Sequence, residues 1–257
     1  MIKIKLLLAM TYRFEFFIGL LSQFFLLFAT TFFWRAAYSG LGVVGDVSQG
    51  QMLTYNVIAI IMAGVFKIEI EGSIRDKVRR GNVAVDFIKP VNVFMMYLSE
   101  DIGAMLTNIV RVAAPILLCS ALFITVPAPA SAARFALFLV SSVFSYMILW
   151  LSSAIFGLFY FWVIEMGPIG TIKDYLIRIL SGSFIPIWFF PDIVQNILKF
   201  LPFIYIYQHP IGIYIGRTPM PEAMAGMGVQ LLWIMLFALL FAVLERRMTK
   251  NIQVQGG

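Results

Sequence analysis

The sequence predicts an all-α integral membrane protein with six transmembrane helices. Hydrophobic residues fill 61% of the 257 positions and charged residues only 12%, whereas soluble domains are roughly half apolar and about a quarter charged. Uncharged runs recur along the whole length of the chain, and a membrane-spanning helix needs about 20 such residues. Because no hydrophilic block is long enough for a separate aqueous domain, residues 1–257 are expected to form one transmembrane domain.

The first half of the chain contains three predicted spans. The first covers Phe16–Trp34, the second ends at Phe66 after a glycine-rich turn, and the third lies between Asp101 and Pro127. Pro115 falls inside the third span, where a missing amide donor and a fixed backbone angle favour a kink.

The second half contains three more predicted spans and an irregular segment. The fourth span covers Phe135–Ile164, and the sixth covers Ala223–Leu244. Between Arg178 and Asp192 only about 13 uncharged residues remain, interrupted by glycine and proline, so the fifth span is expected to be a short or broken helix. Segment 192–222 is apolar but cut by prolines, which predicts short helices that re-enter the membrane from the extracytoplasmic side.

The distribution of basic residues predicts the orientation. With six spans, roughly 14 Lys and Arg residues fall on the side that holds both termini, against roughly four on the other side. Because cytoplasmic loops carry the excess of basic residues, both termini and the hydrophilic loop 67–92 are expected in the cytoplasm.

The loop 67–92 is the main water-facing surface of the sequence. If Glu69–Arg80 forms a helix, then Glu71, Arg75 and Arg79 recur at four-residue spacing as one charged stripe, and Gly81 ends the helix. Such a stripe suits either a docking surface for a partner protein or a solvated loop that faces lipid headgroups.

Several catalytic motifs are missing from the sequence. It has no phosphate-binding loop of the Gly-x-x-x-x-Gly-Lys-Ser/Thr type, so the chain is not expected to be an enzyme or to bind ATP itself. Its single histidine, His209, lies beside a proline, which favours a structural role over a metal site. No metal and no other cofactor are expected in this chain.

Two segments resemble a known family. The run Arg79–Asn92 is similar to the cytoplasmic signature of small six-span permeases of the ABC-2 type, the membrane subunits of ATP-driven exporters. Ser181–Pro186, followed by Leu201–Phe203 and His209–Pro210, resembles the fifth helix and re-entrant segment of the same family. The resemblance covers nearly the whole chain and implies a type-2 ABC exporter architecture in the bacterial plasma (inner) membrane.

The resemblance also implies partners. It predicts a dimer with a second permease subunit, either the same chain or a paralogue, and two cytoplasmic ATP-binding subunits that hold ATP and magnesium. The dimer would export a small hydrophobic or amphipathic compound, and nucleic acid is not expected as a partner. In this family a coupling helix fits a groove of the ATPase, and the matching residues here are Glu69, Glu71, Arg75, Asp76, Arg79 and Arg80.

Polar residues within the spans are candidates for the export route. In the resembled family the first, second and fifth helices line that route, which makes Gln23, Thr30, Thr54, Asn56, Ser181 and Ser183 candidate pathway residues. Hydrogen bonding between helices is an equally good explanation for each of them.

Two further groups have alternative roles. Arg111 and Glu100 share a helix face, where a polar contact within the subunit is favoured over a substrate site. An aromatic cluster within and after the fifth span suits an interfacial belt, or alternatively an outer gate in which Phe184 and Phe190 take part; its members are Phe184, Trp188, Phe189, Phe190, Phe200 and Phe203.

Two other classes of function stay open at this point. An ion-coupled secondary transporter would normally carry carboxylates inside its spans, whereas Glu15, Glu100, Asp101 and Glu165 all lie near predicted span ends. A non-transporting membrane scaffold would use the charged loop 67–92 equally well.

Overall fold

The computed structural model describes residues 13–40, 42–44, 46–81, 86, 92–124, 128–129, 131–163 and 169–255. These residues form long helices, several short helices and one two-stranded antiparallel hairpin. In chain order the elements are α2 (Arg13–Ala37), β1 (Val43–Val44), β2 (Val47–Ser48), α3 (Gln49–Val65), α4 (Ile70–Arg79), α6 (Val93–Asn108), η1 (Ile109–Ala113), α7 (Ala114–Phe123), α8 (Ala132–Phe159), α9 (Ile169–Leu180), η2 (Ile187–Phe189), α10 (Asp192–Leu198), η3 (Phe203–Tyr205), α11 (Gln208–Tyr214) and α12 (Met220–Gln255).

Within the part of the chain that the structure describes, four helical stretches are long and apolar enough to cross a membrane: Phe17–Ala37, Val93–Phe123, Ala132–Phe159 and Met220–Met248. They correspond to the first, third, fourth and sixth predicted spans. Their outer faces carry large exposed apolar side chains such as Phe25, as expected where a helix faces lipid instead of water. The protein is therefore a multi-pass membrane protein.

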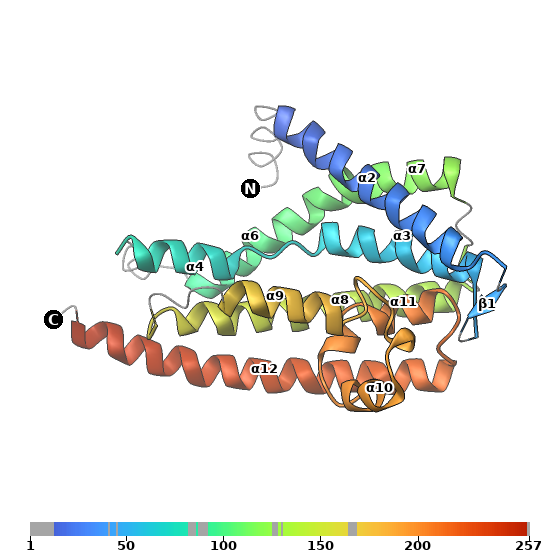
Figure 1. Ribbon diagram of the computed structural model, residues 1–257. Coiled ribbons are helices and arrows are strands. Elements are labelled where there is room, and N and C mark those ends of the chain that lie inside the picture. The colour runs from blue at the N-terminus through green and yellow to red at the C-terminus, as the bar shows by residue number, and fades with distance from the viewer. Residues whose placement is uncertain are drawn as a thin grey trace.

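The helices α3, α8, α9 and α12 run roughly along one direction, whereas α2 and the α6–α7 stretch run obliquely to them (Figure 1). The helix α4 and the C-terminal end of α12 lie at one end of the molecule, and the β1–β2 hairpin and α11 lie at the opposite end (Figure 1). The central helix is α8, which packs against α12, α11 and α4, while α2 packs against α3.

A buried polar cluster joins α8, α12 and η3. The side chain of Gln230 on α12 is fully buried and donates hydrogen bonds to the carbonyl oxygen of Tyr205 at 2.8 Å and to Ser145 Oγ at 3.1 Å. Ser141 Oγ donates in turn to Gln230 Oε1 at 3.0 Å. Because every polar group named here has a hydrogen-bond partner, these hydrogen bonds offset the free-energy cost of burying the polar side chains.

The third predicted span begins earlier than expected. Its helix begins at Val93 instead of after Asp101, because Asn92 Oδ1 accepts a hydrogen bond from the Met95 amide at 3.0 Å and caps the first turn. The charged residues Glu100 and Asp101 lie inside this helix and do not mark its start. The π-helical turn η1 ends directly before α7, the helix that contains Pro115; π-helical turns and prolines are both known causes of a kink, and the kink itself stays a prediction.

The fifth predicted span also needs correction. Its helix, α9, ends at Leu180 and contains Lys173 and Arg178, whereas the uncharged run that follows forms turns and the short helix η2. The helix stops there because Gly182 adopts a φ of +82° and Pro186 cannot continue the hydrogen-bonding pattern. Ser181 and Ser183 therefore lie in a turn after the fifth helix and not within it. The short helices predicted in segment 192–222 are present as α10 and α11.

Candidate coupling site and translocation cavity

The N-terminus of α4 is attached to two long helices by one carboxylate. Asp101 on α6 is buried; its Oδ1 accepts a hydrogen bond from the Glu69 amide at 3.1 Å, and its Oδ2 accepts one from Trp150 Nε1 on α8 at 3.0 Å. A negative charge at a helix N-terminus also interacts favourably with the helix dipole. Asp101 thereby fixes the first turn of α4 to both α6 and α8.

The inner face of α4 packs directly on α8. Ile70 and Ile74 are almost completely buried, and Gly157 of α8 lies beneath them. A Cβ atom at Gly157 would come within 2.9 Å of Ile74 Cδ1 and 3.5 Å of the Glu71 Cα atom. The absence of a side chain at this position lets the two helices approach closely.

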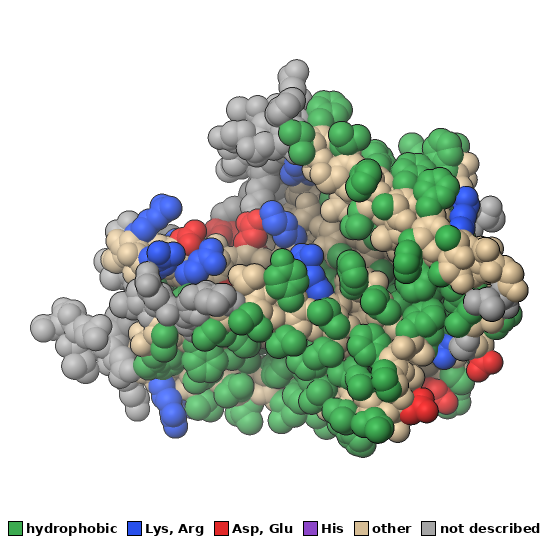
Figure 2. All heavy atoms as spheres, in the orientation of Figure 1, with side chains coloured by type: hydrophobic (Ala, Val, Ile, Leu, Met, Phe, Trp, Pro, Cys, Tyr) green, Lys and Arg blue, Asp and Glu red, His purple; other side chains and the backbone are tan. Residues whose placement is uncertain are grey.

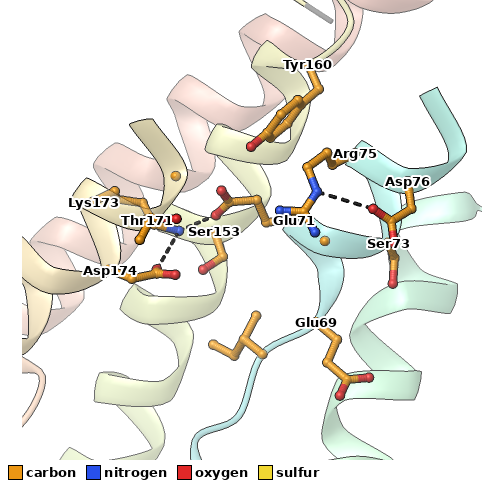
Figure 3. A pocket seen from close by; sticks show the side chains of 13 residues that line it. Glu69, Glu71, Ser73, Arg75, Asp76, Ser153, Tyr160, Thr171, Lys173 and Asp174 are labelled. Atoms are coloured by element: carbon orange, nitrogen blue, oxygen red, sulfur yellow. Dashed lines mark hydrogen bonds and ion pairs between the residues drawn. The ribbon is translucent and has the colours of Figure 1, made fainter. Parts of the chain in front are cut away.

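An ion pair joins α4 to α9. Lys173 Nζ donates a hydrogen bond to the Glu71 carboxylate, and only 8% and 14% of the two side chains are exposed. Figure 3 shows both side chains pointing toward each other, with Asp174 on the other side of the Lys173 amine at 3.1 Å. Removal of one partner of so deeply buried a pair costs stability, because the charge that remains loses its buried counter-charge; Lys173 would then keep only the exposed Asp174.

The C-terminal end of α4 has its own attachment. Lys77 Nζ donates hydrogen bonds to Asp86 and, at 3.0 Å, to Tyr97 OH on α6, and Tyr97 OH donates to Asp86 Oδ2 at 2.7 Å. Asp86 belongs to the sequence signature Arg79–Asn92, of which residues 82–85 and 87–91 lie outside the described residues.

The outer face of α4 carries the exposed charges. Arg75 Nε donates a hydrogen bond to Asp76 Oδ1 at 3.2 Å, and about half of each side chain is exposed. This hydrogen bond raises the pKa of Arg75, so its guanidinium stays charged. Arg79, Arg80 and Glu69 are also exposed.

Beside this face lies a cavity of about 420 Å³, lined by residues of α4, α8 and α9 that include Glu71, Arg75, Ser153, Tyr160 and Lys173. Figure 3 shows these side chains around the opening. We call it the coupling cavity.

The predicted helix Glu69–Arg80 is confirmed as α4, and Gly81 ends it with a φ of +71°. The predicted stripe is not one surface, however. Glu71 turns inward to Lys173, while Arg75 and Arg79 face outward. The helix therefore has an outer charged face and an inner face that is tied to the membrane helices.

Some candidate pathway residues meet at a second cavity of about 420 Å³, which lies between α2, α3, α8 and α9. Gln23, Ser183 and Phe184 line it. We call it the central cavity. Phe190, the other candidate gate residue, is not among the described residues that line it.

The remaining pathway candidates take part in contacts within the protein. Asn56 Nδ2 on α3 donates a hydrogen bond to Thr30 Oγ1 on α2 at 2.9 Å, and Thr54 Oγ1 donates to the Gly50 carbonyl at 2.8 Å. Ser181 is fully buried. For Asn56 and Thr30 the geometry agrees with hydrogen bonding between helices, the alternative left open by the sequence.

Arg111 and Glu100 are far apart along their helix. Eleven positions at about 1.5 Å each separate them by ~16 Å, so the shared face does not imply direct contact. Arg111 lines a third cavity, of about 370 Å³, together with Gln23, Lys67 and Arg178.

Sequence reasoning missed the residues that hold α4 in place. In the sequence, Asp101 marks only the predicted boundary of a span, and Trp150 and Lys173 give no local signal, because each finds its partner only in the folded chain. Among the described residues, no group of three or more His, Cys, Asp and Glu side chains is placed to hold a metal ion.

Comparisons with curated proteins and with solved structures returned no match. A family model described as "ABC-2 family transporter protein" matches residues 24–250, a range that includes α4, α9 and most of the residues lining all three cavities. Since this match spans far more than half of the sequence, the chain belongs to the ABC-2 transporter family and is a membrane permease component of an ABC transporter.

Proposed function

We propose that this chain is the non-catalytic permease subunit of an ATP-driven exporter and that α4 is the helix through which ATP hydrolysis in a separate subunit drives it. The cargo is a hydrophobic or amphipathic compound that leaves the cytoplasm. Two permease subunits, identical or paralogous, act with two cytoplasmic ATP-binding subunits that hold ATP and magnesium.

The observation that carries the proposal is the two-sided character of α4. Its outer face presents Arg75, Asp76 and Arg79 to a partner, while its inner face is attached to α6, α8 and α9. A displacement of α4 by an ATPase therefore reaches three helices at once. A solvated surface loop would not need these attachments.

The route from α4 to the central cavity is short. Glu71 holds Lys173 of α9, and α9 ends at the turn that carries Ser183 and Phe184. Both of these residues line the central cavity. A movement of α4 would thus be transmitted along α9 to the residues that border the cargo route.

We propose six crossings of a bacterial plasma membrane, with both termini in the cytoplasm, and the lengths of the helices are compatible with this number. In addition to the four long spans, α3 has 17 residues, about 26 Å at ~1.5 Å each, close to the ~30 Å hydrocarbon thickness. The helix α9 has only 12 residues, so the turn after it completes the fifth crossing. The short helices α10 and α11 would re-enter the membrane from the outer side.

An ion-coupled transporter is the main alternative, and the buried Asp101 is the residue that it would require. This carboxylate already accepts hydrogen bonds from the Glu69 amide and Trp150 Nε1, which assigns it to holding α4. A non-transporting scaffold would leave the central cavity without a role.

The test is co-purification of the tagged full-length chain from its native membrane. We expect a protein with a Walker-type nucleotide site to co-purify, and Arg75→Glu with Arg79→Glu to reduce its recovery several-fold because the partner surface reverses its charge. Arg247→Glu, an exposed charge at the end of α12, is the matched control and should leave recovery unchanged.

Two results would contradict the proposal. One is equal recovery of the ATPase with the doubly substituted chain. The other is cargo uptake by vesicles that contain only this chain and an ion gradient, with no nucleotide present.

A further inference from the structure

Three basic side chains from different parts of the chain line one cavity. Lys67 follows α3, Arg111 belongs to η1 and Arg178 to α9, and all three border the cavity of about 370 Å³ between α2, α3, η1 and α9. We call it the basic cavity. Among the described residues that line it, none is acidic. Figure 2 shows Lys and Arg side chains gathered in the hollow between α2 and α9.

Arg111 lies deep within a membrane span. It precedes Phe123, the end of the candidate span Val93–Phe123, by 12 residues, or ~18 Å at about 1.5 Å per residue. The hydrocarbon layer is ~30 Å thick. A charged side chain at such a depth is costly unless it faces protein, water or a ligand, and for this reason intramembrane arginines mark functional sites.

The backbone around Arg111 is also irregular. Residues Ile109–Ala113 form a π-helical turn, a geometry that is rare and occurs frequently at functional sites. Three separate observations therefore concern Arg111: it lies deep within a span, its backbone is π-helical, and its side chain lines a cavity.

The other two basic residues form the rim of the cavity. The Lys67 side chain is 68% exposed and its Nζ lies 3.1 Å from Glu69 Oε1, while Arg178 is exposed on α9. The basic cavity thus has positive charge both at its mouth and in its interior, which favours entry and binding of an anion. An arginine guanidinium is suited to phosphate and carboxylate groups, which it binds with two parallel hydrogen bonds.

The basic cavity adjoins the central cavity. The two share Gln23, Ala63, Gly64, Lys67 and Arg178 in their linings. Beyond these shared residues, the central cavity is bordered mostly by apolar side chains such as Leu26, Ile60, Leu149, Ile177 and Phe184. A cavity lined by three basic side chains therefore continues into a mainly apolar one, whose polar lining includes Ser153 and Asp174.

We propose that the basic cavity binds the anionic headgroup of an amphiphilic cargo, with Arg111 contacting a phosphate or carboxylate and the apolar part lying in the central cavity. This inference rests on the proposed transport function and specifies its substrate class. Gln23 lies where the two parts of the ligand meet, and Ser183 and Phe184 border the apolar part.

The test measures binding to the full-length chain in nanodiscs of neutral phosphatidylcholine, by calorimetric titration with three probes. Dodecyl phosphate has both an anion and a chain, dodecyl maltoside has only the chain, and inorganic phosphate has only the anion. We expect saturable binding of dodecyl phosphate at about tenfold or more higher affinity than either of the other probes.

Substituted variants distinguish binding in the basic cavity from non-specific attraction of anions to the basic protein. Arg111→Gln should weaken dodecyl phosphate binding about tenfold, because a charge-assisted contact is lost, and Arg178→Gln should weaken it by a smaller factor. Arg247→Gln, which removes an exposed charge far along the chain, should leave the affinity unchanged. If Arg111→Gln does not fold, the rim pair Lys67→Gln with Arg178→Gln gives the same comparison.

Addition of phosphatidylglycerol to the nanodiscs distinguishes the source of the headgroup. Competition with dodecyl phosphate identifies an anionic membrane lipid as an occupant, and the absence of competition restricts the site to other anionic amphiphiles. The proposal would be overturned if dodecyl maltoside or inorganic phosphate bound with the same affinity as dodecyl phosphate. It would also be overturned if the Arg111 and rim variants bound dodecyl phosphate as tightly as the native chain. Because no ATPase is present, these results are independent of the co-purification test of the transport function.

Discussion

Lys173 on α9 donates a hydrogen bond to Glu71 on α4, and 102 positions of sequence separate the two residues. This hydrogen bond directly links α4, the helix that we propose for coupling, to α9, the helix that leads to the central cavity. Both side chains are largely buried. The contact therefore joins the two helices, and its contribution to stability requires both partners.

Removal of either partner should destabilise the protein and weaken coupling. Glu71→Gln leaves the Lys173 amine without its buried counter-charge, and we expect a loss of about 3 kcal/mol in unfolding free energy. In the assembled complex, the substituted permease should change the ATPase rate less than the native permease does. Thermal unfolding in detergent and ATPase assays with reconstituted complex measure the two effects.

The exchanged pair Glu71→Lys with Lys173→Glu is the control for this experiment. It restores opposite charges across the same contact, so it should recover a substantial part of the lost stability, whereas each single exchange should not. Equal destabilisation by the exchanged pair and by the single variants would show that the contact is not an ion pair in solution.

Asp101 is expected to be important for stability although it lies outside the coupling surface. Asp101→Asn retains one acceptor oxygen but presents an amide group to the second donor, so either the Glu69 amide or Trp150 Nε1 loses its partner. An unsatisfied buried donor costs about 1–3 kcal/mol. The loss should appear as a lower midpoint in thermal unfolding.

A second variant isolates the contact with the indole. In a Trp150→Phe background one of the two donors is already absent, so Asp101→Asn should cost less there than in the native chain. Costs that simply add would indicate that Asp101 acts through some other contact.

The sequence predicts α4 well because its signals are local. Charged residues at helical spacing and Gly81 as a terminator lie within a dozen positions, and the observed helix differs from the expected one by one residue at each end. The same local approach fails at α9. Lys173 and Arg178 interrupt the apolar run, so a search for uncharged residues places the span after Arg178, where Gly182 and Pro186 prevent a helix.

The attachments of α4 could not be predicted for a different physical reason. Asp101 meets Trp150, and Glu71 meets Lys173, only when distant helices pack. Gln230 is a partial exception, because a lone amide in an otherwise apolar span indicates a polar partner. The sequence does not say that Ser141 provides it. Of the candidate pathway and gate residues, Gln23, Ser183 and Phe184 line the central cavity, whereas Thr30 and Asn56 are hydrogen-bonded to each other; their role in a cargo route stays a prediction.

Gly157 should be sensitive to the addition of a single methyl group. In Gly157→Ala the new Cβ comes within 2.9 Å of Ile74 Cδ1, and overpacking of this kind costs about 1–3 kcal/mol. Ile74→Val removes that Cδ1 atom, so the second substitution should relieve most of the cost of the first.

Gly103→Ala is the matched control for Gly157. No heavy atom lies within 4 Å of a Cβ built at Gly103, so alanine there should be neutral or slightly stabilising through its higher helix propensity. The measurement is thermal unfolding of Gly157→Ala, of Gly157→Ala with Ile74→Val, and of Gly103→Ala. A Gly157→Ala protein as stable as the native chain would show that α4 is not seated tightly on α8.

Phe184, rather than Phe190, is expected to act as the barrier of the cargo route. Its side chain is 69% exposed and borders the central cavity, whose described lining does not include Phe190. Phe184→Ala removes an apolar constriction of the kind that closes a pathway by excluding water. Vesicles that contain this variant should therefore release an entrapped fluorescent anionic amphiphile faster without ATP, whereas Phe190→Ala vesicles should release it at the native rate. Fast release from both variants would place the barrier in the aromatic cluster as a whole, and native release from both would remove the gate from this turn.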